Sequence, residues 1–346
     1  MDTLAVPQTE AQALHDSILV LDSHIDIPWP VQPGMEFAQE TRRCVDLPKM
    51  RRGGLRAGCF AAFVPQGRTE EASHNAALAR VEAMLAAIRA MGALGGAHPT
   101  RLCSSADAIM QAWQDRVPAI VPCVENGHAL GGDPARAAWL RSLGAVYLTL
   151  THNGHNALAD SAIPRADLGD AAQRHGGLSA IGRQAVTAMN ACGLVIDVAH
   201  ASREAMIQAA QASRSPVVST HSCMRALCDH PRNLDDAQLD VLRDVGGVVQ
   251  VTAVPGFLRQ GGRMETVGLA DLLDHIDHAV SRIGIAHVGI GSDFDGGGGI
   301  SGWRDAADNP ALTAGLLARG YDAAAIALLW GGNFLRVLRA AESLAA

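Results

Sequence analysis

The segment LSAIGRQAVTAMNACGLVIDVA, residues 178–199, carries a helix pattern followed directly by a strand pattern. Residues 178–193 are rich in alanine, place apolar residues at helical spacing and end in glycine, a common stop signal for a helix. Residues 194–199 form a short run of β-branched and apolar residues, which predicts a buried strand. This helix and this strand belong to an alternation that continues in both directions along the chain.

The strand pattern recurs outward from this segment, in runs of β-branched or small apolar residues bounded by glycine, proline or polar turns. Alanine-rich stretches with helical spacing separate most of these runs. Near-continuous apolar strands are typical of a parallel sheet covered on both faces, and about eight repeats predict an α/β fold, a (β/α)8 TIM barrel. The predicted strands are 18–25, 56–64, 118–124, 145–151, 194–199, 216–220, 247–254 and 287–291.

An open, doubly wound sheet is the competing fold, but no G-x-G-x-x-G motif follows the first predicted strand. A chain of 346 residues can form one large barrel domain. Because no linker, low-complexity tract or internal repeat interrupts the chain, we expect a single domain over residues 1–346, with a short segment, 1–16, preceding the barrel. Residues 29–54 and 296–310 are expected to be irregular insertions near the rim of the active site.

Composition and charge narrow the possible partners. The net charge of −7 disfavours a nucleic-acid partner, which would require a basic face. The first residues contain no basic and apolar pattern of a secretory signal, and the apolar runs are far too short to span a bilayer. The 7 cysteines are scattered and contain no C-x-x-C pair, which argues against a disulfide framework. We therefore expect a cytoplasmic protein without a nucleic-acid or membrane partner.

Metal-binding side chains follow six of the apolar runs, each at the downstream end. In a parallel barrel the carboxyl ends of the strands meet at one face, so these side chains are expected to converge. Histidine and carboxylate groups are the usual protein ligands of zinc. The pattern therefore predicts a metal-centred active site at one end of the barrel, built from His24, Asp26, Glu125, His152, His200, His221 and Asp293.

Five of these residues are the predicted metal ligands. His24 and Asp26 are two positions apart on a predicted strand, so both point to the same side. His200 and His221 end neighbouring strands, and Glu125 would be a costly buried charge unless it bound a metal. Five ligands exceed the usual three of one catalytic zinc and suit two metals with Glu125 as the bridge.

Two further residues bear on the chemistry of this site. A carboxylated lysine could bridge two metals instead of Glu125, but the only lysine, Lys49, follows no strand and is expected in a polar loop. Asp293 ends the last predicted strand and can accept the proton of a metal-activated water and pass it on. Asp295 lies beyond it and is expected to be a turn residue. The ligand types suit zinc, although manganese or iron also remains open.

The chain resembles the membrane (renal) dipeptidase family of the amidohydrolase superfamily. The matching segments are DSHIDIPW (22–29), VENG (124–127), LTHNGHNALAD (150–160), GLVIDVAHAS (193–202), STHS (219–222), HPRN (230–233), DHIDHAVSRIGIAHVGIGSDFDG (274–296) and GGNFLRV (331–337). The resemblance implies a binuclear zinc barrel, a homodimer, that hydrolyses a dipeptide with a free C-terminal carboxylate, of L,L and also L,D configuration, through attack of a metal-bridging hydroxide.

The same segments imply a role for each site residue. His24 and Asp26 would hold one metal and His200 and His221 the other, with Glu125 between them. Asp293 would be the general acid and base. His152 would contact the oxyanion, and Arg232 would bind the terminal carboxylate of the substrate.

One position departs from the family pattern. Members often carry a tyrosine at the end of strand seven, where this chain has Val254. Substrate preference is therefore open, and the alternative function is an amidohydrolase acting on N-acyl amino acids or another small amide or lactone. A metal-stabilised binding protein without activity is a third possibility, which the retained acid and base, Asp293, argues against.

Overall fold

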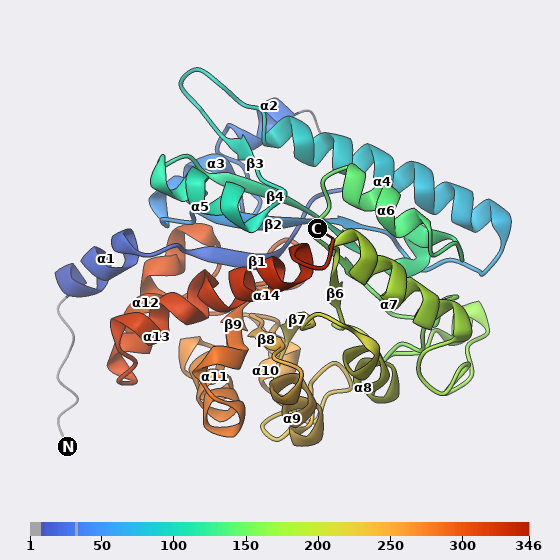
Figure 1. Ribbon diagram of the computed structural model, residues 1–346. Helices are drawn as coiled ribbons and strands as arrows, with labels where there is room; N and C mark the ends of the chain where they lie inside the picture. The colour runs from blue at the N-terminus through green and yellow to red at the C-terminus, as the bar shows by residue number, and fades with distance from the viewer. Residues whose placement is uncertain (1–7, 32–33, 346) are drawn as a thin grey trace.

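Eight parallel strands pair in chain order to form a nearly closed barrel in this computed structural model, which describes residues 8–31 and 34–345 (Figure 1). A parallel bridge between Ile25 and Phe294 joins the first strand to the segment after the last, and the Asp26 N–H donates to the Phe294 carbonyl at 2.9 Å. The predicted barrel is therefore confirmed. Its strands are β1 (Leu21–Asp26), β2 (Ala57–Phe63), β4 (Ala119–Glu125), β5 (Tyr147–Thr149), β6 (Val195–Asp197), β7 (Val218–Ser222), β8 (Val248–Val251) and β9 (Val288–Ile290).

Helices connect the strands and surround the barrel (Figure 1). One extra strand, β3 (Arg101–Leu102), pairs with β4 outside the ring. Among the described residues, no helix has both the length and the apolar character needed to cross a membrane. The α-helices are α1 (Gln8–Ser17), α2 (Gly34–Phe37), α3 (Leu47–Arg52), α4 (Glu71–Met91), α5 (Ala106–Gln114), α6 (Arg136–Ser142), α7 (Ala180–Cys192), α8 (Arg203–Ala212), α9 (Asp236–Asp244), α10 (Pro255–Leu258), α11 (Leu269–Ile283), α12 (Asn309–Ala318), α13 (Ala323–Ala327) and α14 (Asn333–Glu342).

The helix and strand of the opening segment show why the chain folds this way. In α7 the Ser179 hydroxyl accepts from the Gly182 N–H at the first turn, and Gly193 ends the helix with a left-handed φ of 70°. A residue with a Cβ is strained at that φ, so glycine is the natural stop. The strand β6 follows after one residue, and all of its residues are buried.

The barrel core is sealed at its amino-terminal end by the last helix. Buried side chains at the starts of several strands, including Leu21, Val195 and Val248, form one apolar cluster with α14 residues such as Phe334 and Leu338. In Figure 1 this helix runs across the barrel. Because this end is closed by packing, the opposite end, where the strands finish, is the one open to a ligand.

The structure corrects two details of the predicted insertions. Residues 29–54 are not wholly irregular, because they contain α2 and α3, although residues 32 and 33 lie outside the described part. Lys49 lies in α3 and not in a polar loop, and its buried ammonium contacts the Asp46 carboxylate at 2.5 Å. A capped proline-containing turn, in which Asp46 accepts from the Lys49 N–H, explains this short helix.

The other predicted segments agree with the structure where it describes them. Residues 296–310 contain isolated bridges, a short 3-10 turn and the start of α12, and are otherwise irregular. Of the segment 1–16, residues 1–7 lie outside the described part, whereas α1 packs against α12. The prediction of a single domain stays a prediction.

Candidate metal centre

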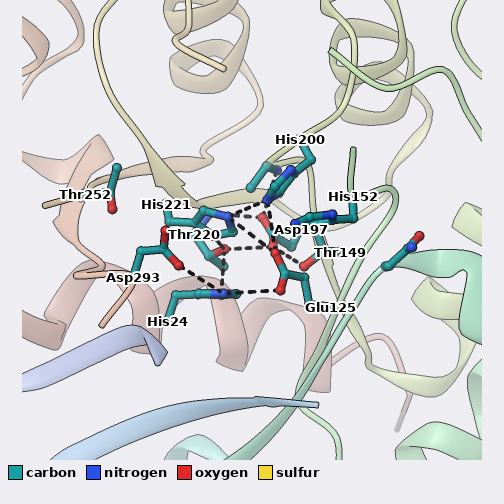
Figure 2. A network of polar contacts seen from close by, with 12 residues as sticks. His24, Glu125, Thr149, His152, Asp197, His200, Thr220, His221, Thr252 and Asp293 are labelled. Atoms are coloured by element: carbon teal, nitrogen blue, oxygen red, sulfur yellow. Dashed lines mark hydrogen bonds and ion pairs between the residues drawn. The ribbon is translucent and has the colours of Figure 1, made fainter. Parts of the chain in front are cut away.

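The predicted metal ligands come together at the carboxyl ends of the barrel strands. Ligand atoms of three overlapping groups lie within 4.8 Å of one another: His24, Glu125 and His221; Glu125, His152 and His200; His24, Asp26 and Asp293. Figure 2 shows most of these side chains pointing toward one another from separate strand ends. The convergence predicted from the sequence is therefore present.

The backbone at two of these strand ends adopts a conformation that is rare outside glycine. His200 has a φ of 64° and Asp293 a φ of 61°. A left-handed conformation of a non-glycine residue costs roughly 1–3 kcal/mol and is found preferentially at functional sites. At both positions it accompanies a side chain of the cluster, which indicates that the fold tolerates strain to aim these groups.

Three of the histidines are fixed in the same tautomer by bonds at Nδ1. The Tyr147 hydroxyl donates to the Ser23 carbonyl at 3.0 Å, so His24 Nδ1–H must donate to that hydroxyl, at 2.8 Å. By the same reasoning His200 Nδ1–H donates to the Asn153 Oδ1 at 3.2 Å, since that oxygen is only an acceptor. In the neutral form of each ring, Nε2 is therefore the unprotonated nitrogen, and it faces the centre of the site.

His221 follows the same rule through a longer chain. The Thr220 hydroxyl donates to the Asp197 carboxylate at 2.8 Å, so His221 Nδ1–H donates to Thr220 Oγ1, at 2.9 Å. Asp197 also accepts from Thr149, at 2.5 Å, as Figure 2 shows. Histidine ligands of metals usually have their second nitrogen held in this way by a neighbouring polar group.

Glu125 lies between the histidines and presents one carboxylate oxygen to each side. Its Oε2 lies 3.7 Å from His24 Nε2, whereas its Oε1 lies 3.0 Å from His200 Nε2 and 3.6 Å from His221 Nε2. The carboxylate is buried, with 2 % of the residue exposed. This position is the one that a bridging carboxylate requires.

The donor set fits divalent metal ions. Among the described residues, His24 Nε2 and Asp26 Oδ1 are buried without a hydrogen-bond partner. The protons of the neutral His200 and His221 rings are on Nδ1, so both Nε2 atoms carry a lone pair. These two atoms nevertheless lie only 2.9 Å apart. Buried lone pairs that face one another around a carboxylate are costly unless a cation binds them. The residues therefore fit a metal centre of imidazole and carboxylate ligands.

Burial and charge shift the protonation of the groups around this centre. Burial raises the pKa of Asp293 to about 7, the charge of Glu125 adds to this, and His24 and Arg232 oppose it. Burial lowers the pKa of Arg232 to about 10, although Asp293 and Glu125 favour its charged form. The guanidinium thus stays protonated at neutral pH, and the carboxyl of Asp293 can both hold and release a proton there.

A cavity of about 590 Å³ opens above the cluster and contains the remaining predicted residues. Arg232, His152 and Val254 all line it, together with Trp29 and Phe257. Arg232 Nη2 donates to the His221 carbonyl at 3.2 Å, and its buried Nε has no partner among the described residues. A guanidinium held at one edge with free donors suits a carboxylate ligand.

The structure separates Asp295 from the metal cluster. Its carboxylate accepts from the N–H groups of Cys44 and Val45, at 2.9 and 3.2 Å, and lies 3.6 Å from Arg43. Asp295 lies in a turn, as predicted. Its carboxylate, however, does not cap that turn but ties the segment after β1 to the segment after β9. The Lys49 ammonium is instead bound by the Asp46 carboxylate and the Thr41 carbonyl, at 2.5 and 2.9 Å.

Sequence reasoning missed the residues that orient the histidines: Tyr147, Asn153, Asp197 and Thr220. Two of them carried a signal. Asp197 is a carboxylate inside the apolar run LVIDVA, and a buried carboxylate needs hydrogen-bond partners. Tyr147 lies inside the run VYLTLT, and a buried tyrosine hydroxyl usually finds a partner.

Comparison with known proteins adds an independent finding. Residues 8–346 match the membrane dipeptidase family, peptidase family M19. Dipeptidase tcpJ of Claviceps purpurea is 31% identical over 307 residues, covering 87% of this chain and 70% of that protein.

Two solved structures are similar over nearly their whole length. The probable dipeptidase PvdM from Pseudomonas aeruginosa superimposes with a TM-score of 0.90 at 30% identity, covering 97% of this chain and 98% of that one. A metallo peptidase from Rhodobacter sphaeroides, liganded with a phosphinate mimic of the dipeptide L-Ala-D-Ala, has a TM-score of 0.79 at 26% identity, covering 94% and 99%.

Proposed function

The chain belongs to the membrane dipeptidase family and is a dipeptidase, and on that premise we propose that it uses two zinc ions to hydrolyse dipeptides with a free C-terminal carboxylate. His24 and Asp26 would hold one ion, His200 and His221 the other, and Glu125 would bridge them. The position of the Glu125 carboxylate, with its two oxygens facing different histidines, is the observation that carries this proposal. When bound, the metal ions supply Lewis acidity that lowers the pKa of a water molecule to about 7.

Asp293 moves the proton in the proposed mechanism. As water attacks the carbonyl carbon of the peptide bond, Asp293 accepts a proton from it. When the carbon–nitrogen bond breaks, Asp293 delivers this proton to the leaving amine nitrogen. Its Oδ1 lies 3.9 Å from His24 Nε2, so the carboxyl is already next to the ligands where attack would occur.

His152 and Arg232 position the substrate. The His152 ring lies 4.2 Å from the His200 ring, between centroids, so an N–H of His152 can donate to the carbonyl oxygen as it gains negative charge. Arg232, which donates to the His221 carbonyl, would bind the C-terminal carboxylate and thereby orient the peptide bond. Arg232 also restricts the substrate length, because a longer peptide has no carboxylate at that position.

The experiment that tests this function is amine release from a dipeptide panel by zinc-loaded protein. The panel contains L,L and L,D pairs, such as the L-Ala-D-Ala stereochemistry mimicked in the Rhodobacter structure, with N-acetylated and C-amidated controls. We expect cleavage of free dipeptides only, and its loss with chelator. Cleavage of the N-acetylated controls without cleavage of free dipeptides would contradict the proposal.

That contrary result would favour the amidohydrolase alternative. Val254 lines the cavity and offers no hydroxyl group to a substrate, which is the observation that keeps this alternative open. The homodimer and the cytoplasmic location stay predictions.

A further inference from the structure

A second arginine, Arg80 of α4, lines the same cavity as Arg232. Its Nε donates to the Phe63 carbonyl at 2.9 Å, at the end of β2. Its guanidinium carbon lies 4.6 Å from the centre of the Trp29 ring and 5.6 Å from the centre of the Phe63 ring. Two aromatic faces and one backbone bond therefore hold this cation in a defined place at the cavity wall.

Among the residues that the structure describes, the one hydrogen bond of Arg80 is that of its Nε, and its terminal nitrogens have no hydrogen-bond or ion-pair partner. Most arginines on the helices of this protein do have one, for example Arg282 with Asp240 and Arg203 with Asp235. Arg80 is half-buried. A fixed, partly desolvated guanidinium with free donors that face a cavity is suited to bind a carboxylate from outside the chain.

The two arginines lie on opposite sides of the cavity. Arg80 is bonded to the end of β2, and Arg232 to the His221 carbonyl of β7. In the ring order β1-β2-β4-β5-β6-β7-β8-β9, these two strands are four places apart in either direction. Because the metal ligands lie between them, a substrate held by Arg232 at its C-terminal carboxylate extends its N-terminal residue toward Arg80.

We propose that Arg80 binds a carboxylate on the side chain of the N-terminal residue, so that the preferred substrates are dipeptides that begin with aspartate or glutamate. This inference rests on the proposed dipeptidase function and on Arg232 as the carboxylate site. The substrate's ammonium group is repelled by Arg80, so only the side chain is suited to this place.

The space around Arg80 permits such a side chain. A second cavity of about 330 Å³ meets the first at Trp29 and Arg80 and continues between α4 and the segment after β2. Its wall is mostly apolar, but Gln66, Ser73 and His128 also line it and place polar groups there. A glutamate side chain therefore has room beside the guanidinium.

The test compares two dipeptides of nearly equal shape that differ in one charge, L-Glu-L-Ala and L-Gln-L-Ala. For the metal-loaded wild-type protein we expect kcat/KM to be about 10 to 100 times higher for L-Glu-L-Ala, as one charge-assisted hydrogen-bond site would give. In Arg80→Met this ratio should fall toward one, mostly through KM, while Arg80→Lys should keep part of it. Added salt should reduce the wild-type ratio.

Arg89→Met is the matched control. Arg89 lies on the same helix, is also half-buried and donates one hydrogen bond to a backbone carbonyl, that of Leu143 at 3.2 Å, yet it does not line the cavity. Its variant should keep the wild-type ratio. A merely structural role of Arg80 would lower the rates for both dipeptides equally and leave the ratio unchanged.

The possible results distinguish a failure of the proposed role of Arg80 from a failure of the proposed dipeptidase function. If wild type cleaves L-Gln-L-Ala but shows no preference for L-Glu-L-Ala, or if Arg80→Met keeps the preference, the role of Arg80 is wrong and the dipeptidase function stands. If wild type cleaves neither dipeptide nor any other free dipeptide of the panel, the proposed function fails and the inference fails with it.

Discussion

Glu125 is the residue on which the two-metal arrangement depends, because its carboxylate contacts histidines on both sides. We expect Glu125→Ala to reduce bound zinc below two per chain and to lower kcat/KM by at least about 100-fold, since the loss of a bridging ligand disturbs both ions. Metal content by mass spectrometry and activity on one dipeptide check this together. A variant that is fully loaded and active would exclude the bridging role.

Tyr147 is expected to act on the metal through His24. Tyr147→Phe removes the hydroxyl group that His24 Nδ1–H binds, so this hydrogen bond no longer fixes the orientation of the His24 ring. Loss of such a partner typically weakens metal affinity about 10- to 100-fold. Zinc competition against a chelator of known affinity measures this without reference to catalysis.

The other tyrosine provides the control for this prediction. Tyr321, which lies between α12 and α13, donates to the Asp277 carboxylate of α11 at 2.7 Å and does not line the cavity. Tyr321→Phe should leave zinc affinity at the wild-type value. Equal zinc affinity of Tyr147→Phe and wild type would show that the hydroxyl does not orient the ligand.

Arg232 is expected to recognise the C-terminal carboxylate. Arg232→Met should raise KM for free dipeptides about 10- to 100-fold, because one charge-assisted site is lost. KM for the matching C-terminal amides should change far less, since an amide carries no charge to lose. Steady-state kinetics on both substrate series checks this, and a thermal melt shows whether the buried variant still folds. The same rise for acids and amides would remove Arg232 from carboxylate binding.

The sequence predicted the proposed metal ligands but not the residues that hydrogen-bond to these ligands. The ligands His200 and His221 follow strand runs directly, so the barrel rule alone placed them at one mouth. Asn153, which holds His200, lies in an irregular loop whose path depends on tertiary packing. No period or motif predicts which loop amide meets which ring.

At the scale of elements, α11 illustrates why the helices were predictable. Leu272, Ile276, Ala279 and Ile283 recur at helical spacing and are all buried against the barrel. We expect Ile276→Ala to destabilise the fold by about 2–5 kcal/mol, because it leaves a cavity in a close-packed core. Denaturant unfolding of the metal-loaded protein measures this.

Val280→Ala on the same helix is the comparison for Ile276→Ala. Val280 is only half-buried, so its truncation removes less apolar surface from the core and should cost about 1 kcal/mol. Both variants should keep the wild-type zinc content, since α11 supplies no ligand. Equal losses in stability would contradict the one-sided packing of this helix.

Strand positions were predictable to within a few residues, whereas the segments between them were not. The run 247–254 contains β8, which ends at Val251, because the chain then turns into α10 at Pro255. The segment 29–54 contains α3, in which Lys49 is buried and paired with Asp46. Neither the helix nor this ion pair could be recognised from the composition of the segment. Apolar periodicity reports burial against the barrel, and a short capped helix on the rim has no such period.

At the scale of the whole molecule, the position of Arg80 shows how the closed ring relates residues that no sequence pattern links. Arg80 belongs to a helix on the outside of the barrel, and only its reach over the end of β2 brings its guanidinium into the cavity. The alternation of strands and helices predicted the ring. Which residues of the surrounding helices line the cavity depends on the length of their side chains and on the position of each helix. The periodicity of the sequence specifies neither.

Metal binding is also expected to stabilise the whole barrel, because the five proposed ligands come from strands β1, β4, β6 and β7 and their nearest loops. An ion that binds only the folded chain adds about 2.7 kcal/mol to the free energy of unfolding at roughly 100 times its Kd. Since about 1 kcal/mol corresponds to a few degrees or less in a chain of this size, chelation should lower the melting temperature by roughly 5 °C. Scanning calorimetry of metal-loaded and metal-free protein measures this difference in melting temperature.

Glu125→Ala should show a smaller difference in melting temperature, because its site already lacks the ligand between the two histidine groups. An identical melting temperature for loaded and fully stripped wild type would mean that these strands do not share a metal site.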